Sequence, residues 1–527
     1  MDLQQRNGTV EALKSELNKL CVTRANLVKQ VEDIDKEVFE ISLNLSRHNL
    51  IHYLPDEILS LIFTFAVQTL PYKCLPCPSI DISHVCKRWR AVAINTSQLW
   101  TNILLTGAES VDHLMRYLER SKARPLRIML NFTAERPKPW QHFLREDWDR
   151  FQTYLAPLYH HTHRWQFFGV YTNHIPIVTR ILDRLNTLTA PILEQVVLCL
   201  DNHQGAGIPP PHTISIRAPL LTSLHTTNIR LRCPGITANL KHLFIGHRSA
   251  VFTVNRKALR RLFALSPNLE AVALSHIRYA PHESTVDDEE GNESSDPGVN
   301  IQASSLRDLR LDSVSSMHTL LEELNAPALM RLEIANLTEV QFDDFTEAMA
   351  RLRFPTVTEL AFTRIKVSTD MSLPAALAKN FPAVQTLALI GTDATPFIWL
   401  LIDPDKQSPP IQFLPFGPFH FLHFWPNVTT LYISKMSEDA SLLRELLQTR
   451  FLSLHPQSPI AKRVSHIFVE ESMVLPYGVV SALQLAGVSL GSFIAPEHVF
   501  DDLRSPSGPN ARSRHPKWLN PDCACNS

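Results

Sequence analysis

A serine between two glycines is the clearest candidate for catalytic chemistry in this chain. The string Gly487-Val-Ser-Leu-Gly491 has the G-x-S-x-G form, in which Ser489 would be the nucleophile of a hydrolase. Such a nucleophile needs a strand before it and a helix after it, but residues 481–486 are typical of a helix. Asp501 and His515 follow only in or near a polar tail, and the sequence has no His-Gly-Gly oxyanion segment. We therefore expect no catalytic residues.

Cysteines and histidines offer a second kind of chemistry, the binding of a metal ion. Cys74 and Cys77 have the two-residue spacing of a zinc knuckle, but no second well-spaced pair accompanies them. The histidines of segment 160–163 precede Trp165 and Phe168, which favours the entry of a strand over a metal site. The sequence also has no G-x-x-x-x-G-K string to hold a phosphate. We expect neither a metal nor a cofactor.

Composition limits the classes of protein that remain. The chain has 527 residues, 44% of them hydrophobic, which is enough for more than one sizeable core. Lysine plus arginine number 51 and aspartate plus glutamate 52, so no basic excess indicates a nucleic-acid partner. No apolar run reaches the roughly 20 residues that span a bilayer, and the N-terminus lacks the apolar segment of a secretion signal. Eight scattered cysteines fit a reducing compartment, so we expect a cytoplasmic or nuclear protein.

The elements that carry function therefore have to be sought in apolar patterns, and the densest lies over residues 54–100. Pro55 suits the first position of a helix, and Asp56 and Glu57 favour its positively charged end. A second helix is expected over 81–93. The apolar positions are Ile58, Leu59, Ile62, Phe63 and Ala66 in the first helix, and Ile82, Val85, Cys86, Trp89 and Val92 in the second. So short a module cannot bury all of these side chains alone, which predicts a partner.

The residue order LP-x-EIL-x-x-IF, VC-K-x-W and LW along this stretch resembles the F-box. The matching residues are Leu54, Pro55, Glu57, Ile58, Leu59, Ile62 and Phe63, then Val85, Cys86, Arg88, Trp89, Val92, Leu99 and Trp100. The resemblance implies a small helical F-box over 49–103 that docks onto a Skp-type adaptor and, through it, a cullin complex. The expected adaptor-binding residues are Leu54, Pro55, Ile58, Leu59, Ile62, Val85, Trp89 and Trp100. Some of these residues must instead hold the module together.

A heptad pattern precedes the F-box. Apolar residues from Leu13 to Leu45 follow a 3-4 alternation that is interrupted only by Arg24, with charged residues between them. This two-position seam predicts a coiled-coil helix over 1–48. Two interpretations remain open, namely a homodimer through residues 10–45 and a single amphipathic helix that packs back on the C-terminal domain.

A recurring phrase dominates the C-terminal part of the chain. It consists of a proline, an apolar residue, two variable residues and then two apolar residues in alternation, which mark a short strand with one buried face. Copies lie at 190–198, 218–226, 266–274, 326–334, 354–362, 381–389 and 425–433, and copies without the proline begin at Leu240, Leu306 and Val464. Helical stretches over 315–324, 343–352 and 437–447 separate some of them. Earlier strands are expected over 124–130 and 163–168.

A strand and a helix that alternate in this way are typical of a leucine-rich-repeat solenoid. The intervals are unequal and the usual Asn or Cys position is mostly apolar, so the domain over 104–500 resembles that class only irregularly. The expected fold is therefore α+β: a coiled-coil helix, a helical F-box, and an irregular leucine-rich-repeat-like α/β solenoid with a parallel sheet. The whole arrangement resembles F-box proteins expanded in mushroom-forming fungi. Residues 282–300, an acidic loop, and 501–527, a polar tail, are expected to be disordered.

These expectations define a function. The protein is predicted to be a non-catalytic F-box subunit of a Skp-cullin-F-box type ubiquitin ligase, with the solenoid binding a protein substrate that the sequence does not identify. The alternative is an F-box scaffold without ligase activity, assembled through the coiled coil. In either case the strands of the recurring phrase should alternate between two faces. We expect Leu332 and Leu387 to face inward, and residues between the buried positions, such as Arg331 and Glu333, to face outward.

Overall fold

The structure is a computed structural model of the chain, and it divides into two compact units. One unit comprises Met1–Gln68 and Pro78–Thr96, and the other comprises Thr69–Cys77 and Ser97–Ser527. The described residues are 3–47, 50–69, 78–106, 110–132, 148–200, 212–213, 216–229, 231–232, 238–247, 253–280, 300–349, 353–367, 377, 379–402, 425–436, 442–443, 445–446, 464–470, 473, 475, 477–485 and 487–493.

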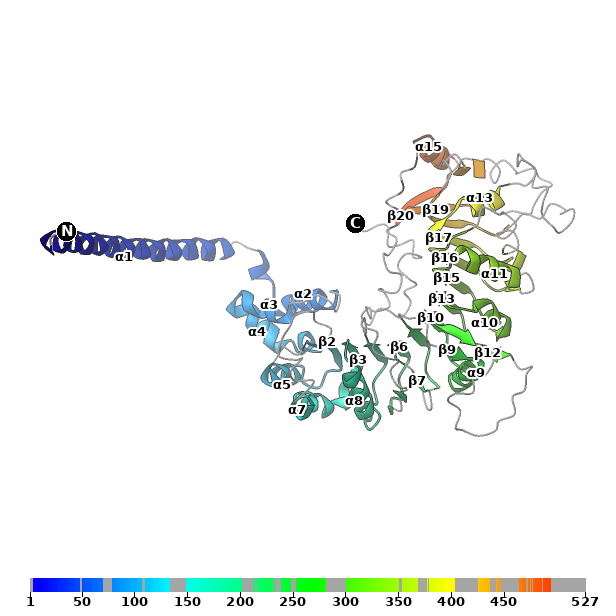
Figure 1. The fold of residues 1–527 in the computed structure, drawn as a ribbon, viewed down its shortest axis with the longest axis horizontal. Helices are drawn as coiled ribbons and strands as arrows, with labels where there is room; N and C mark the ends of the chain where they lie inside the picture. Colours follow the sequence, from blue (N-terminus) through cyan, green and yellow to red (C-terminus); the bar gives the residue numbers. More distant parts are fainter. Residues whose placement is uncertain are drawn as a thin grey trace. The chain divides into compact units, whose positions relative to one another are not determined.

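The first unit is helical in the residues described (Figure 1). Its elements are α1 (Leu3–Arg47), η1 (Leu50–Tyr53), α2 (Asp56–Thr69), α3 (Pro78–Val85) and α4 (Lys87–Asn95). The heptad stretch thus forms one continuous helix of 45 residues, as its periodicity predicts. Helix α2 begins directly after Pro55, with both carboxylates of its first turn at the positive end of the helix dipole.

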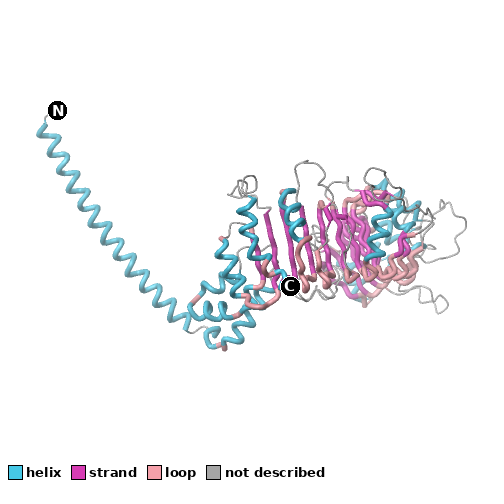
Figure 2. The backbone as a smooth tube through the Cα atoms, turned by 90° about the horizontal axis from the view of Figure 1, so that it is seen from below, coloured by secondary structure: helices cyan, strands magenta, loops and turns pink. Residues whose placement is uncertain are grey.

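The second unit is organised around a parallel sheet, in which 14 strands are seen among the described residues. Each strand pairs in parallel with the one placed beside it in chain order (Figure 2). The strands are β1 (Asn102–Leu105), β2 (Leu126–Phe132), β3 (Trp165–Thr172), β4 (Gln195–Leu200), β6 (Ser223–Thr227), β8 (His242–Gly246), β10 (Ala271–Ser275), β13 (Asp308–Asp312), β15 (Arg331–Ala335), β16 (Glu359–Thr363), β17 (Thr386–Asp393), β18 (Thr430–Lys435), β19 (His466–Glu470) and β20 (Ser489–Phe493). Every copy of the recurring phrase ends in one of these strands.

Helices and short turns connect the strands. They are η2 (Ser97–Trp100), α5 (Val111–Arg120), α7 (Trp148–Tyr159), η3 (Thr162–Arg164), α8 (Ile175–Leu185), α9 (Arg256–Leu265), α10 (Met317–Glu323), α11 (Glu339–Met349), α13 (Thr395–Leu401) and α15 (Tyr477–Leu485). In the part of the chain that the structure describes, two-stranded parallel pairs accompany the main sheet: β5 (His212–Thr213) with β7 (Leu231–Arg232), β9 (Thr253–Asn255) with β11 (Arg278–Ala280), and β12 (Ile301–Gln302) with β14 (Leu324–Asn325). Helices α9, α10 and α11 lie along one side of the sheet (Figure 1).

The core of the second unit lies under the alternating apolar positions of the strands. Leu332 and Leu387 are both fully buried, as their place in the phrase predicts. The two residues lie in one row that crosses three strands, because Leu332 pairs with Leu360 and Leu360 pairs with Leu387. A parallel ladder in which equivalent residues align builds continuous apolar rows, and this makes each strand depend on its two neighbours.

A repeated left-handed residue ends the central strands. The residues after β6, β10, β13, β15 and β16 are Asn228, His276, Ser313, Asn336 and Arg364, each with φ between 51° and 58°. Each backbone N–H donates to the carbonyl of the fifth residue of the next strand, at 2.6–3.0 Å. Left-handed backbone is costly for residues with a side chain, and this hydrogen bond offsets part of the cost. The equivalent residue after the fifth paired position of β17 is Gly391, which adopts φ 61° without that cost.

The expected α+β arrangement of an N-terminal helix, a small helical region and a large parallel sheet is confirmed, whereas the leucine-rich-repeat likeness stays a prediction. Cys74 and Cys77, the acidic loop at 282–300 except residue 300, and the tail at 501–527 lie outside the described residues. No described helix combines the length and the apolar character needed to cross a bilayer.

Candidate functional site

Helix α2 is apolar on two opposite faces. Leu59, Phe63 and Val67 recur at four-residue intervals and are buried. On the other side lie Ile58, Leu61, Ile62 and Phe65, whose exposed fractions are 41%, 65%, 43% and 70%. Their i, i+3, i+4, i+7 spacing places them in one stripe, which we call the exposed apolar face. One face therefore builds the unit and the other is an apolar surface exposed to solvent.

The buried side of α2 packs against α4. The rings of Phe63 and Trp89 lie 4.7 Å apart between centroids in a tilted arrangement, and Val92 and Ala93 of α4 are buried. The hydroxyl group of Ser60 in α2 is also hydrogen-bonded at 2.9 Å to that of Thr96, the C-cap residue of α4. An aromatic pair of this kind adds about 0.5–1.5 kcal/mol beyond the area it buries. This packing holds α2 in the orientation that leaves its other face exposed.

The single helix expected over 81–93 is wrong, because the chain breaks at Cys86 into α3 and α4. Cys86 is extended, with φ −156° and ψ 171°, and its Sγ accepts a hydrogen bond from the backbone N–H of Trp89 at 3.4 Å. The residue is thus the N-cap of α4, a position that supplies an acceptor to an otherwise unpaired helix donor. Arg90 then ties the two helices together, since its Nε donates to the carbonyl of Ser83 at 3.0 Å.

Arg88 of α4 fixes the start of α2. Its guanidinium donates to Oδ1 of Asp56, from Nε at 2.9 Å and from Nη2 at 2.7 Å, and also to the carbonyl oxygen of Leu54. Both charged side chains are partly exposed, so the ion pair itself adds little stability. The hydrogen bond to Leu54 matters more, because it holds the Leu54-Pro55 corner from which the exposed apolar face begins.

The residues that the sequence assigned to adaptor binding fall into two groups. Pro55, Ile58, Ile62 and Val85 are exposed, and Leu54 and Trp89 are half-buried. Leu59 and Trp100 are buried, and each therefore holds its own unit together. Trp100 belongs to the second unit, where its ring meets that of Tyr117 edge-on at 5.0 Å and the guanidinium of Arg120 lies 4.4 Å from its centroid.

Sequence reasoning missed large apolar side chains that are exposed on and just before helix α2. Tyr53 is 74% exposed, and Leu61 and Phe65 of the exposed apolar face are almost as open to solvent. A signal for them exists in the sequence. Helix α2 is apolar at nearly every position from 58 to 67, which is more than one buried face requires.

The second face of the central strands is not the open surface that the sequence suggested, and the expected exposure of Glu333 and Arg331 is wrong. Glu333 points away from the Leu332 side as alternation requires, but only 4% of it is exposed. Arg310 of the neighbouring strand lies 3.2 Å from its carboxylate, and the hydroxyl of Thr363 donates to it at 3.2 Å. Arg331 contacts Glu359 at 2.6 Å across the next strand. Parallel neighbours at strand spacing enclose these side chains between them.

Burial has an electrostatic consequence at this cluster. Desolvation raises the pKa of the Glu333 carboxyl above its usual value, and the nearby Arg310 opposes the rise. Glu333 thus has its polar contacts inside the sheet unit rather than with solvent.

The described residues contain no arrangement suited to catalysis at Ser489 and no cluster of three or more metal-ligating side chains. Ser489 opens strand β20 and follows helix α15, which reverses the strand-then-helix order that a nucleophile requires.

The comparison with family models bears on this same region. Residues 51–106 match the model of the F-box-like family. The match covers α2, α3 and α4 and extends through η2 into β1, so the chain carries an F-box-like domain that includes the buried Trp100. A search of curated proteins finds no relative. Domains of this family bind Skp-type adaptors and are generally non-catalytic, and here the F-box-like domain carries the exposed apolar face.

Proposed function

We propose that this protein is a non-catalytic substrate-recognition subunit of a Skp-cullin-F-box type ubiquitin ligase. The exposed apolar face of the F-box-like domain binds a Skp-type adaptor, which links the chain to a cullin. The parallel-sheet unit binds a protein substrate. The observation that carries the proposal is that Ile58, Leu61, Ile62 and Phe65 stand exposed on one helix inside the matched region. Scattered exposed apolar residues are ordinary, whereas a contiguous row on a well-packed helix marks an interaction site.

The mechanism is proximity. The adaptor and cullin position a ubiquitin-charged enzyme, and the sheet unit holds the substrate beside it. Tethering raises the effective concentration of a substrate lysine near the reactive thioester without a catalytic group from this chain.

The first prediction tests the adaptor interface. Replacing both Ile58 and Ile62 by Asp should weaken binding of a Skp-type adaptor by at least about 100-fold. Each buried isoleucine contributes about 1.5–3 kcal/mol, and 1.4 kcal/mol corresponds to about tenfold in affinity. Binding is measured by titration of the purified adaptor into the full-length protein. The control is Met330→Asp, which places one aspartate at a similarly exposed apolar residue of the second unit.

Undiminished binding by the double variant, with an unchanged circular dichroism spectrum, would remove the exposed apolar face from the interface. Separate Leu61→Asp and Phe65→Asp variants then establish how far along α2 the partner reaches. We expect both to bind more weakly than Met330→Asp, because both lie in the same stripe.

Co-purification distinguishes the ligase from a scaffold assembled through α1. Recovery of a cullin with the full-length protein, and its loss in the Ile58→Asp/Ile62→Asp variant, supports the ligase. Recovery of the adaptor without a cullin supports the scaffold. Proteins that co-purify with both forms, but are ubiquitinated only with the unmodified one, are the substrates that the sheet unit holds.

A further inference from the structure

Helix α1 exposes an apolar seam along its length. From Leu13 to Ile41 every side chain of the helix is exposed, including those of the a/d series. The exposed members of that series are Leu13, Leu17, Leu20, Leu27, Val31, Ile34, Val38 and Ile41. A seam two positions wide is too narrow to form a core by itself, and it is the form of surface that a second helix covers.

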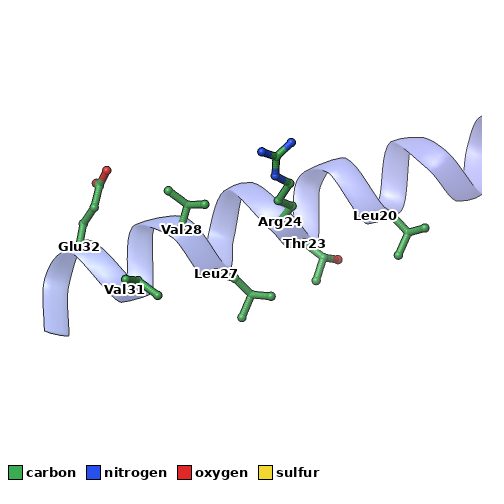
Figure 3. A pocket seen from close by; sticks show the side chains of 7 residues that line it. All are labelled: Leu20, Thr23, Arg24, Leu27, Val28, Val31 and Glu32. Carbon is green, nitrogen blue, oxygen red and sulfur yellow. The ribbon is translucent and has the colours of Figure 1, made fainter. Parts of the chain in front are cut away.

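The centre of the seam combines apolar residues with one arginine. Figure 3 shows Leu20, Leu27 and Val31 on one side of the helix, while Arg24 turns toward the side that carries Val28 and Glu32. By its spacing Arg24 occupies an a position, with Leu17 and Val31 one heptad before and after it. In a parallel, in-register pair, a positions face each other, and two Arg24 guanidiniums would meet in the seam.

Charge is segregated along the same helix. Residues 13–30 contain four basic residues, Lys14, Lys19, Arg24 and Lys29, and one acidic residue, Glu16, which gives a net charge of +3. Residues 31–41 contain five acidic residues, Glu32, Asp33, Asp35, Glu37 and Glu40, and one basic residue, Lys36, which gives −4. The charge of the first half of the helix is therefore complementary to that of the second half in another copy. Two first halves repel each other, and so do two second halves.

We propose that α1 pairs with α1 of a second copy of this chain in an antiparallel coiled coil. An antiparallel pair sets the basic half of each helix against the acidic half of its partner. It also pairs a positions with d positions, so Arg24 faces an apolar residue and reaches the partner's carboxylates along the seam edge. Individual surface ion pairs are weak, but interhelical charges decide orientation when the apolar seam fits either way. Pairing through α1 does not require adaptor binding.

The orientation has a functional consequence. The F-box-like domain follows the C-terminal end of α1, so an antiparallel pair carries its two domains at opposite ends of a rod roughly 60 Å long, at about 1.5 Å per residue. A parallel pair would instead carry both at one end. The antiparallel dimer can thus hold two adaptor complexes apart.

Cross-linking of the full-length protein tests the orientation directly. A zero-length carbodiimide couples a lysine to a carboxylate that it touches. Lys14 and Asp35 of one helix lie about 31 Å apart at 1.5 Å per residue, so a link between them requires two chains. In an equimolar, fully exchanged mixture of ¹⁴N- and ¹⁵N-labelled protein, we expect mixed-isotope links from Lys14 or Lys19 to the acidic residues of 32–40. Mixed-isotope links confined to residues close in sequence, such as Lys14 to Glu16, would overturn the proposal, as would a monomer at tens of micromolar in light scattering.

A charge variant gives an independent readout. Replacing Lys14, Lys19 and Lys29 by Glu changes the first half of the seam region from +3 to −3 and keeps residues of similar helix propensity. An antiparallel dimer then sets acid against acid, and its dissociation constant should rise at least about tenfold, since opposite charges become like charges at several positions. A parallel dimer keeps like-charge repulsion of equal size and should not change. Leu27→Asp is the control for the seam and should give a monomer; an unchanged dimer in either variant contradicts the proposal.

Discussion

At the scale of one residue, Glu333 is a charged side chain that is buried within the sheet unit. Its carboxylate lies between β13 and β16, with Arg310 on one side and Thr363 on the other. Removing one partner from a buried pair leaves an uncompensated charge, which typically costs about 3–5 kcal/mol. An acidic residue on the second face of a strand thus becomes a structural residue when its neighbours on both adjacent strands enclose it.

The pH dependence of stability should reveal this residue. Because burial raises the pKa of Glu333 above 4.5, the folded state holds its proton more tightly than the unfolded state. The resulting stability is present in full below the unfolded pKa and is lost as pH rises through the folded pKa. The free energy of unfolding of the unmodified protein, relative to Glu333→Gln, should therefore fall as pH rises above about 4.5. Denaturant titrations of both proteins across this range measure the difference, and parallel curves would contradict it.

At the scale of elements, a side-chain hydrogen-bond acceptor stabilises the start of α4 after the break from α3. Cys86 accepts from the N–H of Trp89, and that tryptophan in turn packs on Phe63 of α2. Trp89 therefore takes part in both the capping contact and the aromatic contact, so the start of α4 and the packing of α2 are coupled.

The cap predicts opposite outcomes for two substitutions of Cys86. Cys86→Ser keeps an acceptor and should leave stability unchanged or slightly raised, since serine is a favoured N-cap. Cys86→Val has similar size but no acceptor, and it should cost about 1 kcal/mol. Hydrogen exchange of the α4 amides in the full-length protein reads out the local effect. Equal protection in the two variants would mean that the Sγ contact does not cap the helix.

At the scale of the whole molecule, the division into two units predicts that a destabilising substitution in one unit leaves the stability of the other unit unchanged. Leu332 is fully buried in β15, so Leu332→Ala should lower the stability of the sheet unit by about 2–5 kcal/mol. Met330→Ala, half-exposed just before the same strand, should cost no more than about 0.5 kcal/mol. Exchange should accelerate first in β13, β15 and β16, because each strand depends on its neighbours. Protection in α2 and α4 should not change; a loss there would show that the two units fold as one.

The sequence by itself determined many of the elements, although it did not show the break at Cys86 between α3 and α4. The 3-4 periodicity predicted α1 as one helix, the proline-led phrase located the strands, and the F-box-like residue order identified 54–100, because each of these signals is local and repeats along a few turns or residues. Only the tertiary structure decided which of those residues are exposed. Alternation placed Glu333 opposite Leu332, but Arg310 and Thr363 from other strands buried it. Helical spacing made Leu59 and Ile62 equivalent, yet α4 covers one side of α2 and leaves the other open, and Trp100 packs with Tyr117 in the second unit. Burial depends on side chains that arrive from distant parts of the chain, and no local pattern contains them.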